Sequence, residues 1–182
     1  MQIDVATGLL NVARWCESPN QDARAAVEDI ELVVVHGISL PPGEYGGPHV
    51  EALFTNRLDP SAHPYFETIA HLRVSAHVLI CRDASLIQFV PFHRRAWHAG
   101  ESCYGERDNC NDFSIGIELE GVDDCPYADI QYTALARVVG TLLNTYPRLA
   151  AHSIVGHSDI APQRKTDPGP AFDWCKFTNL LG

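Results

Sequence analysis

Three side chains capable of catalytic chemistry lie close together near the C-terminal end of the chain. His157, Lys165 and Asp167 fall within residues 155 to 174, a segment that contains three prolines. Because proline stops helices and fixes loop geometry, we expect a rigid loop here. A neutral imidazole and a carboxylate are good zinc ligands, and a nearby ammonium group could face a developing negative charge. A solvated loop is the alternative, since a zinc site needs at least one more ligand.

A histidine also stands at the end of a predicted buried strand. Residues 32 to 35 form a continuous aliphatic run, which is typical of a central strand buried on both faces. His36 follows this run directly and precedes a turn-rich stretch. Proteins with α/β folds commonly place functional groups where a buried strand opens into a loop. A histidine satisfied within the core is the alternative, and position alone does not decide between them.

Two pairs of histidines offer rival zinc ligands on spacing alone. His93 and His98 are five residues apart, as are His152 and His157. Neither pair has nearby cysteines that would make a structural zinc finger, so both are weak candidates. The six cysteines contain no CxxC pair. We interpret them as reduced thiols, although the sequence leaves a bridge between Cys103 and Cys110 open.

A predicted strand carries two acidic residues that could enter a site. Residues 114 to 120 alternate cleanly, so that the three aliphatic side chains should face a core. Glu118 and Glu120 share the opposite face with small residues, which leave room for a cleft. A solvated strand face is the alternative.

The other elements predict one folded domain. We expect residues 1 to 30 to form a partly helical wrap and residues 31 to 178 to form the core. A hairpin is expected from 76 to 90, a core-packing amphipathic helix from 130 to 146, and short helices at 50 to 54 and 65 to 72. No helix should continue across Asp59-Pro60 or His63-Pro64.

Composition excludes several classes of protein. The 182 residues are 46% hydrophobic and 20% charged, which is typical of a globular domain. A net charge of -10 argues against binding to nucleic acid or to an acidic membrane surface. No apolar run approaches the ~20 residues that span a bilayer, and the N-terminus lacks the features of a secretory signal. We therefore expect a cytoplasmic protein.

Several separated motifs, taken together, resemble those of a known enzyme family. They are VVVHGISLPPG, HLRVSAH, RAWHAG, NDFSIGIELEG and GHSDIAPQRKTDPGP, which occur in this order between Leu32 and Phe177. They resemble the zinc amidases related to peptidoglycan recognition proteins and to phage lysozyme-type amidases. The resemblance implies a mixed α+β fold of the α/β type, in which helices flank a central mixed β-sheet and zinc lies at one end of the sheet.

The resemblance also assigns the ligands and the catalytic groups. It implies that His36, His157 and Asp167 bind one Zn²⁺ ion, which returns His93 and His152 to structural roles. By motif, Glu118 is the general base and Lys165 stabilises the oxyanion. Two imidazoles and one carboxylate leave the ion a positive charge and an open fourth position, where the pKa of water falls to about 7.

The implied substrate is an anhydro-muropeptide. The nearest branch of the family is bacterial and cytoplasmic, and it hydrolyses the amide between the lactyl group of 1,6-anhydro-N-acetylmuramic acid and L-alanine during cell-wall recycling. The resemblance makes Arg73 a sugar-side contact and makes Trp97 and His98 walls of the cleft. We expect a monomer.

Two departures from the family pattern concern substrate binding. Gly37 stands where relatives often carry Asn, and it offers no side-chain hydrogen bond. Asn109 stands where relatives often carry Arg, and our hypothesis is that Arg107 substitutes for the missing charge. Two alternative functions remain: a non-catalytic muropeptide-binding module, and an exported amidase that acts on polymeric peptidoglycan. A complete set of three ligands with Glu118 and Lys165 favours catalysis.

Overall fold

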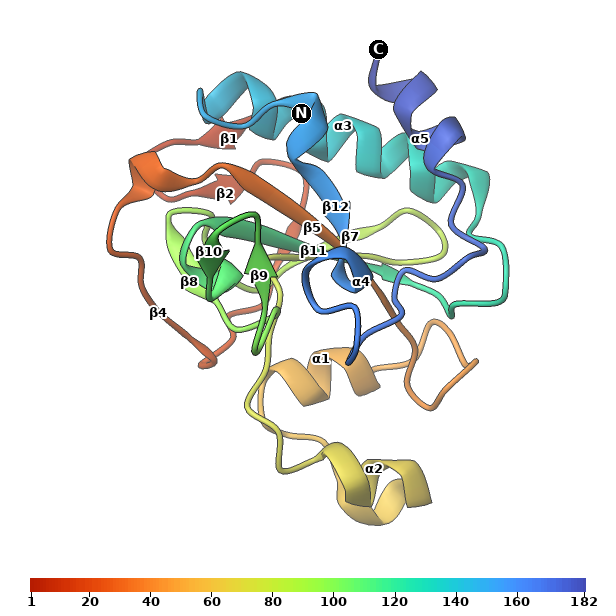
Figure 1. Cartoon of the computed structure of the whole chain (residues 1–182). Helices are drawn as coiled ribbons and strands as arrows, with labels where there is room; N and C mark the ends of the chain where they lie inside the picture. Colours follow the sequence, from red (N-terminus) through yellow and green to blue (C-terminus); the bar gives the residue numbers. More distant parts are fainter.

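The computed structural model describes all residues from 1 to 182 and has a central sheet with helices on both sides (Figure 1). Six strands form this sheet: β3 (Arg14–Trp15), β5 (Leu32–Ile38), β6 (Val78–Ile80), β7 (Leu86–Gln88), β11 (Ser114–Glu120) and β12 (Ile154–Gly156). The α-helices are α1 (His49–Phe54), α2 (Pro64–Ile69), α3 (Asp129–Thr145), α4 (His157–Ile160) and α5 (Trp174–Leu181). The mixed α+β class expected from the sequence is confirmed.

The sheet runs in the order β12-β5-β11-β6-β7-β3 and mixes parallel with antiparallel pairs. β5 is parallel to both β12 and β11, and β6 and β7 form the expected antiparallel hairpin. β5 extends to Ile38, so His36 lies within the strand rather than just after it. The hairpin joins the sheet beside β11 and not beside β5, because β11 occupies the central position.

One face of the sheet packs against α3 and α5, which lie side by side above it in Figure 1. The aliphatic side chains of β11 and alternate residues of β5 meet the apolar stripe of α3 in a core of 22 buried residues. This confirms the amphipathic helix expected from 130 to 146. Fully burying an aliphatic side chain of this kind contributes roughly 1.5–3 kcal/mol, so this face anchors the strands that carry the site.

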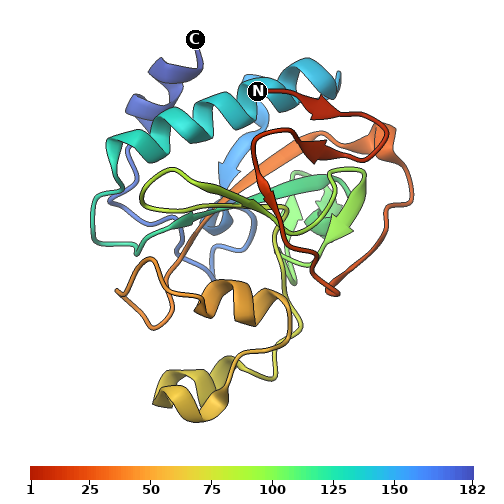
Figure 2. The same cartoon turned by 180° about the vertical axis from the view of Figure 1, so that it is seen from behind.

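The other face is covered partly by α1 and α2, which hang below the sheet in both views (Figures 1 and 2). A second cluster of 11 buried residues joins α1, Phe66 of α2 and Leu79 of β6. The predicted breaks are confirmed, since Asp59 and His63 cap the N-termini of η2 (Pro60–Ala62) and α2 with their side chains. Elsewhere this face is free to form a cleft.

The N-terminal 30 residues differ from the partly helical segment expected. They form β1 (Ile3–Asp4) paired with β2 (Leu9–Leu10), then β3, β4 (Gln21–Ala23) and the 3₁₀ turn η1 (Val27–Asp29). β3 pairs with β7 and forms the edge of the central sheet opposite β12, and β4 pairs with β8 (Arg94–Ala96) in a separate two-stranded sheet. Strands of two or three residues are too short to show a periodic pattern, which is why the sequence did not reveal them.

The remaining elements are small. β9 (Cys103–Tyr104) and β10 (Arg107–Asp108) form a hairpin, followed by η3 (Cys110–Asp112), and η4 (Ala151–Ser153) precedes β12. All six cysteines are free thiols, so the bridge between Cys103 and Cys110 is not formed. None of the helices is both long and apolar enough to cross a membrane.

Candidate metal centre and active-site cleft

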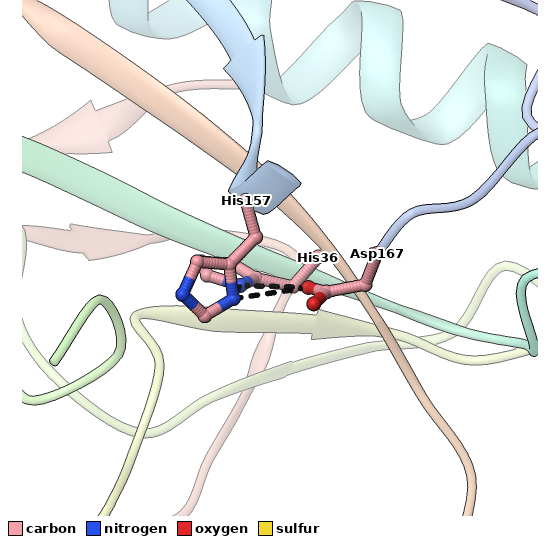
Figure 3. Close-up of side chains that lie close together, drawn as sticks. All are labelled: His36, His157 and Asp167. Atoms are coloured by element: carbon pink, nitrogen blue, oxygen red, sulfur yellow. Dashed lines mark hydrogen bonds and ion pairs between the residues drawn. The ribbon is translucent and has the colours of Figure 1, made fainter. Parts of the chain in front are cut away.

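Three side chains converge at one end of the sheet (Figure 3). The Nδ1 atoms of His36 and His157 lie 2.9 Å apart, and Oδ2 of Asp167 lies 3.2 Å and 3.1 Å from them. Both imidazoles are buried, and the carboxylate is 15% exposed. This is a grouping of potential ligand atoms that could hold a metal ion.

Strand register explains why two of these residues meet. β12 and β5 are parallel neighbours, with Gly156 opposite Val35, so the residues that follow, His157 at the start of α4 and His36 within β5, lie side by side at one end of the sheet. On the other side of β5, Glu118 is directly opposite His36. Because adjacent strands lie about 4.8 Å apart, these three side chains form one row across the sheet.

The third ligand candidate comes from a loop that is tied to the sheet. The backbone carbonyl of Asp167 accepts a hydrogen bond from the amide of Ser158 at 3.0 Å. The next carbonyl, that of Pro168, accepts a hydrogen bond from the hydroxyl of Tyr127 at 3.0 Å. These two bonds hold the carboxylate of Asp167 over the histidines.

The donor set fits a zinc ion. A tetrahedral ion with bonds of about 2.0–2.1 Å holds its ligand atoms roughly 3.3 Å apart, close to the separations found here. Burial lowers the pKa of His36 to about 4, so its ring is neutral at physiological pH. Burial raises the pKa of Asp167, but the close approach of the ring nitrogens of His157 and His36 outweighs this effect and brings the pKa below its usual value. The cluster therefore presents one carboxylate and at least one neutral imidazole.

The cluster opens into a cleft of about 710 Å³. Glu118 and Lys165 both line this cleft, together with the three ligand candidates. Glu118 is 8% exposed and its Oε2 atom has no hydrogen-bond partner. The alternative of a solvated strand face therefore does not apply to Glu118, whose side chain is buried.

The environment of Glu118 favours proton transfer. Burial raises the pKa of its carboxyl well above the usual value, with a further contribution from the negative charge of Asp167, while Lys165 acts in the opposite direction. A carboxylate with a raised pKa is a better proton acceptor. An unpaired carboxylate oxygen in a cleft is also costly to maintain, which is typical of a functional group.

The structure brings only one of the four predicted substrate contacts into the cleft. His98 lines it, whereas Arg73, Trp97 and Arg107 do not. The guanidinium of Arg73 is exposed and donates to the carbonyls of His71 and Leu72, although its neighbours Leu72 and Val74 line the cleft. Arg73 therefore lies at the rim.

Arg107 is held elsewhere by ion pairs. Its guanidinium bonds to the carboxylates of Asp29 and Glu31 and lies 4.0 Å from the ring centroid of Phe113. With two carboxylate partners, it cannot replace a missing substrate-binding charge as arranged here. Trp97 is half-buried, and its backbone exchanges hydrogen bonds with Ser75.

The two departures from the family pattern have local reasons. A Cβ atom at Gly37 would lie 2.3 Å from the hydroxyl oxygen of Tyr127, so this hydroxyl occupies the space of a side chain. Asn109 has a φ of 59°, in the left-handed region that Asn tolerates better than most residues. Sequence reasoning also missed Tyr65, which lines the cleft from α2 and is 40% exposed.

Comparisons with known proteins agree with this geometry. The sequence profile of the N-acetylmuramoyl-L-alanine amidase family matches residues 26–170. The 1,6-anhydro-N-acetylmuramyl-L-alanine amidase AmpD of Escherichia coli (strain K12) is 59% identical over 174 residues, covering 96% of this chain and 94% of that protein. A crystal structure of a selenomethionine derivative of AmpD superimposes with a TM-score of 0.96 at 56% identity and full coverage of both chains.

A more distant structure contains a substrate. It is the complex of the E. coli amidase AmiD with anhydro-N-acetylmuramic acid-L-Ala-D-γ-Glu-L-Lys, at 29% identity and a TM-score of 0.61, covering 87% of this chain and 60% of that one. The profile match spans most of the chain and contains every ligand candidate. The chain therefore belongs to the N-acetylmuramoyl-L-alanine amidase family.

Proposed function

We propose that this protein is a zinc-dependent amidase that hydrolyses the lactyl–L-alanine amide of 1,6-anhydro-N-acetylmuramyl peptides. One observation carries the proposal: the three ligand candidates and the unpaired carboxylate of Glu118 line the same cleft. A module that only binds muropeptides would have no use for this combination. The names of the relatives at 58–59% identity support the anhydro-muropeptide as substrate.

His36, His157 and Asp167 would hold the zinc ion. When bound, such an ion acts as a Lewis acid and lowers the pKa of water to about 7. The distal ring nitrogens of both histidines are hydrogen-bonded, to His98 and to the carbonyl of Ala99. Partners of this kind orient ligand imidazoles and raise their basicity.

Glu118 and Lys165 would perform the proton transfer and the charge stabilisation. Glu118 takes a proton from the attacking water, and later delivers it to the departing L-alanine nitrogen. The ammonium group of Lys165 faces the negative charge that develops on the carbonyl oxygen. An amide has a poor leaving group, so both contributions are needed.

The same proposal includes the setting of the reaction. All of the groups named come from one chain, so we propose a monomer. The net charge of -10 disfavours nucleic acid or an acidic membrane surface as a partner. Free thiols, three of them exposed, suit the reducing cytoplasm.

The test is hydrolysis of synthetic anhydro-N-acetylmuramyl tripeptide, followed by mass spectrometry with zinc-loaded and chelated protein. The N-acetylmuramyl peptide without the anhydro ring serves as the matched substrate. We expect free tripeptide only with zinc, and faster release from the anhydro substrate. Equal cleavage of both would indicate a broad cell-wall amidase. Zinc binding without cleavage of either would indicate a binding module.

A further inference from the structure

The ligand candidate His36 is also hydrogen-bonded on the side away from the metal cluster. Its Nε2 atom lies 3.0 Å from Nδ1 of His98, and Nε2 of His98 lies 3.2 Å from the hydroxyl of Ser114. That hydroxyl lies 2.5 Å from the carbonyl oxygen of Cys110. All four residues are buried. The chain of contacts connects the cluster to a backbone carbonyl through two side chains.

The direction of each of these three hydrogen bonds follows from the last acceptor, the carbonyl oxygen of Cys110. A carbonyl oxygen can only accept, so the single proton of the Ser114 hydroxyl points to Cys110. The hydroxyl must then accept from Nε2–H of His98. In a neutral ring this leaves Nδ1 of His98 without a proton, so it accepts from Nε2–H of His36. Nδ1 of His36 then carries a free lone pair that points into the cluster (Figure 3).

The alternative protonation state of His98 is unfavourable. A doubly protonated His98 would be a buried cation with no carboxylate among its hydrogen-bond partners, which are His36 and Ser114. Burying a charge without such a partner is costly. The neutral ring with a proton on Nε2 satisfies every contact.

We propose that the Cys110 carbonyl, Ser114 and His98 form a tautomer relay that holds the Nδ1 lone pair of His36 ready for the metal ion. His98 is then a positioning residue for the metal centre, and not primarily a wall that contacts substrate. Both of its ring nitrogens are occupied by protein partners, so neither remains for a ligand in the cleft. This inference rests on the proposed function, since it assigns His36 to the metal.

The packing around His98 fixes the relay in place. A Cβ atom at Gly116 would lie 2.4 Å from Cγ of His98, so only glycine at this position of β11 admits the ring. The amides of His98 and Ala99 both donate to the side-chain oxygen of Asn111, at 3.0 Å and 2.8 Å. The ring therefore has a defined position between His36 and Ser114.

The two histidine ligands reach equivalent acceptors by different routes. Nε2 of His157 lies 3.2 Å from the carbonyl oxygen of Ala99, so it donates directly to the backbone. His36 lies within a central strand and reaches its carbonyl only through His98 and Ser114. The relay thus connects Nε2 of His36 to a backbone carbonyl, whereas Nε2 of His157 contacts a backbone carbonyl directly.

The variant Ser114→Ala tests the relay. It removes the acceptor of His98, which can then adopt either tautomer, so that His36 loses its preset proton position. We expect the affinity for zinc to fall about 10–100-fold, the range typical of such supporting partners. Ser102→Ala is the matched control, because Ser102 accepts a hydrogen bond from the amide of Cys110 at 3.1 Å but takes no part in the relay. It should bind zinc like the wild type.

Two measurements on the whole 182-residue chain decide the question. Long-range ¹H–¹⁵N NMR of chelated, histidine-labelled protein reports which ring nitrogen of His36 carries the proton, and competition with a chromophoric chelator gives the zinc dissociation constant. We expect protonated Nε2 in the wild type and in Ser102→Ala, and mixed tautomers in Ser114→Ala. His98→Asn, whose side-chain oxygen can still accept from His36, should bind zinc more tightly than His98→Ala.

Three results would overturn the relay. They are a proton on Nδ1 of His36 in the wild type, an unchanged tautomer and affinity in Ser114→Ala, and an equal loss of affinity in Ser102→Ala. Thermal unfolding of the chelated variants checks that each one folds, and the wild-type tautomer decides the matter if Ser114→Ala does not. A wild type that fails to bind zinc would contradict the proposed function, while the tautomer measurement would still test the relay.

Discussion

Replacing Glu118 by glutamine should separate the catalytic role of this residue from its effect on stability. Glutamine has the same shape as glutamate but cannot accept a proton from water. Glu118 is not one of the three clustered ligand candidates, so the variant should bind zinc normally. Its hydrolysis of anhydro-N-acetylmuramyl tripeptide should be almost abolished.

The size of the catalytic loss follows from the role of a general base. Proton transfer by a positioned side chain contributes about 10²–10⁴-fold. We therefore expect kcat/KM to fall by roughly 10²–10⁴, which corresponds to about 3–5 kcal/mol of transition-state stabilisation. The loss should appear mainly in kcat, because the carboxylate acts on the reacting groups rather than on the sugar or the peptide.

The same substitution should stabilise the chelated protein. Burial raises the pKa of Glu118, so the folded state binds this proton more tightly than the unfolded chain does. The resulting stabilisation is complete below the unfolded pKa of about 4.3 and is lost as pH rises through the raised pKa. Glutamine has no acidic proton to lose, so the variant keeps its stability as the pH rises. At pH 8 we expect a gain of roughly 1–3 kcal/mol, since an unpaired buried charge is replaced by a neutral amide.

Calorimetry and mass spectrometry check both halves of this prediction. For a chain of this length, each kcal/mol should raise the melting temperature by about 2–4 °C, and the difference from the wild type should shrink towards pH 4. Near-normal turnover by the zinc-replete variant would refute the assignment of Glu118 as base. Equal melting temperatures at every pH would refute the argument from its unpaired oxygen.

Three further predictions concern the metal centre and its surroundings. Asp167→Ala removes one of the three clustered ligand atoms, so a chelator competition should show a larger loss of zinc affinity than the ~10–100-fold typical of supporting residues. Gly37→Asn places an atom against the hydroxyl of Tyr127, and should lower the melting temperature by an amount equivalent to about 1–3 kcal/mol; Tyr127→Phe in the same chain should recover part of it, and an additive loss would contradict this contact. Arg107→Ala should leave KM unchanged, because Arg107 forms ion pairs away from the cleft. Arg137→Ala, which removes an exposed arginine on α3, is the control for the loss of one positive charge. A raised KM would show that Arg107 does reach the substrate. The hydrogen bond from Arg107 lowers the pKa of Asp29, so this ion pair stabilises the folded protein by less than ~1 kcal/mol above about pH 4, and the stabilisation disappears as pH falls.

The sequence predicted the elements that have a strong local pattern. The aliphatic run before His36, the alternation around Glu118 and the helix from 130 to 146 all correspond to observed elements. The loop around Asp167 was identified from its prolines. In each of these cases the periodicity or the breaker residues lie within one short segment, so no long-range contact had to be known.

The properties that depend on pairing between distant segments could not be predicted in this way. Burial of Glu118 requires both faces of β11 to be covered, which no alternating pattern reveals. The ion pairs of Arg107 join β10 to residues about 76 positions earlier in the chain. The role of His98 depends on Gly116 leaving room for its ring, and a spacing of five from His93 suggested a different role altogether. Register and close approach, rather than composition, decide these features.

The arrangement of the site follows from one row across the sheet and one tethered loop. His157, His36 and Glu118 leave three adjacent parallel strands at the same level, and these strands are fixed by a large core on the α3 side. Lys165 and Asp167 arrive on a loop that only a few hydrogen bonds connect to this frame. The two imidazoles and the carboxylate of Glu118 are therefore positioned by the whole sheet, whereas the carboxylate of Asp167 and the ammonium group of Lys165 are positioned locally. Because all three ligand candidates must keep one mutual geometry to hold an ion, the hydrogen bonds from Ser158 and Tyr127 have to fix the carboxylate of Asp167 as firmly as the sheet fixes the two imidazoles.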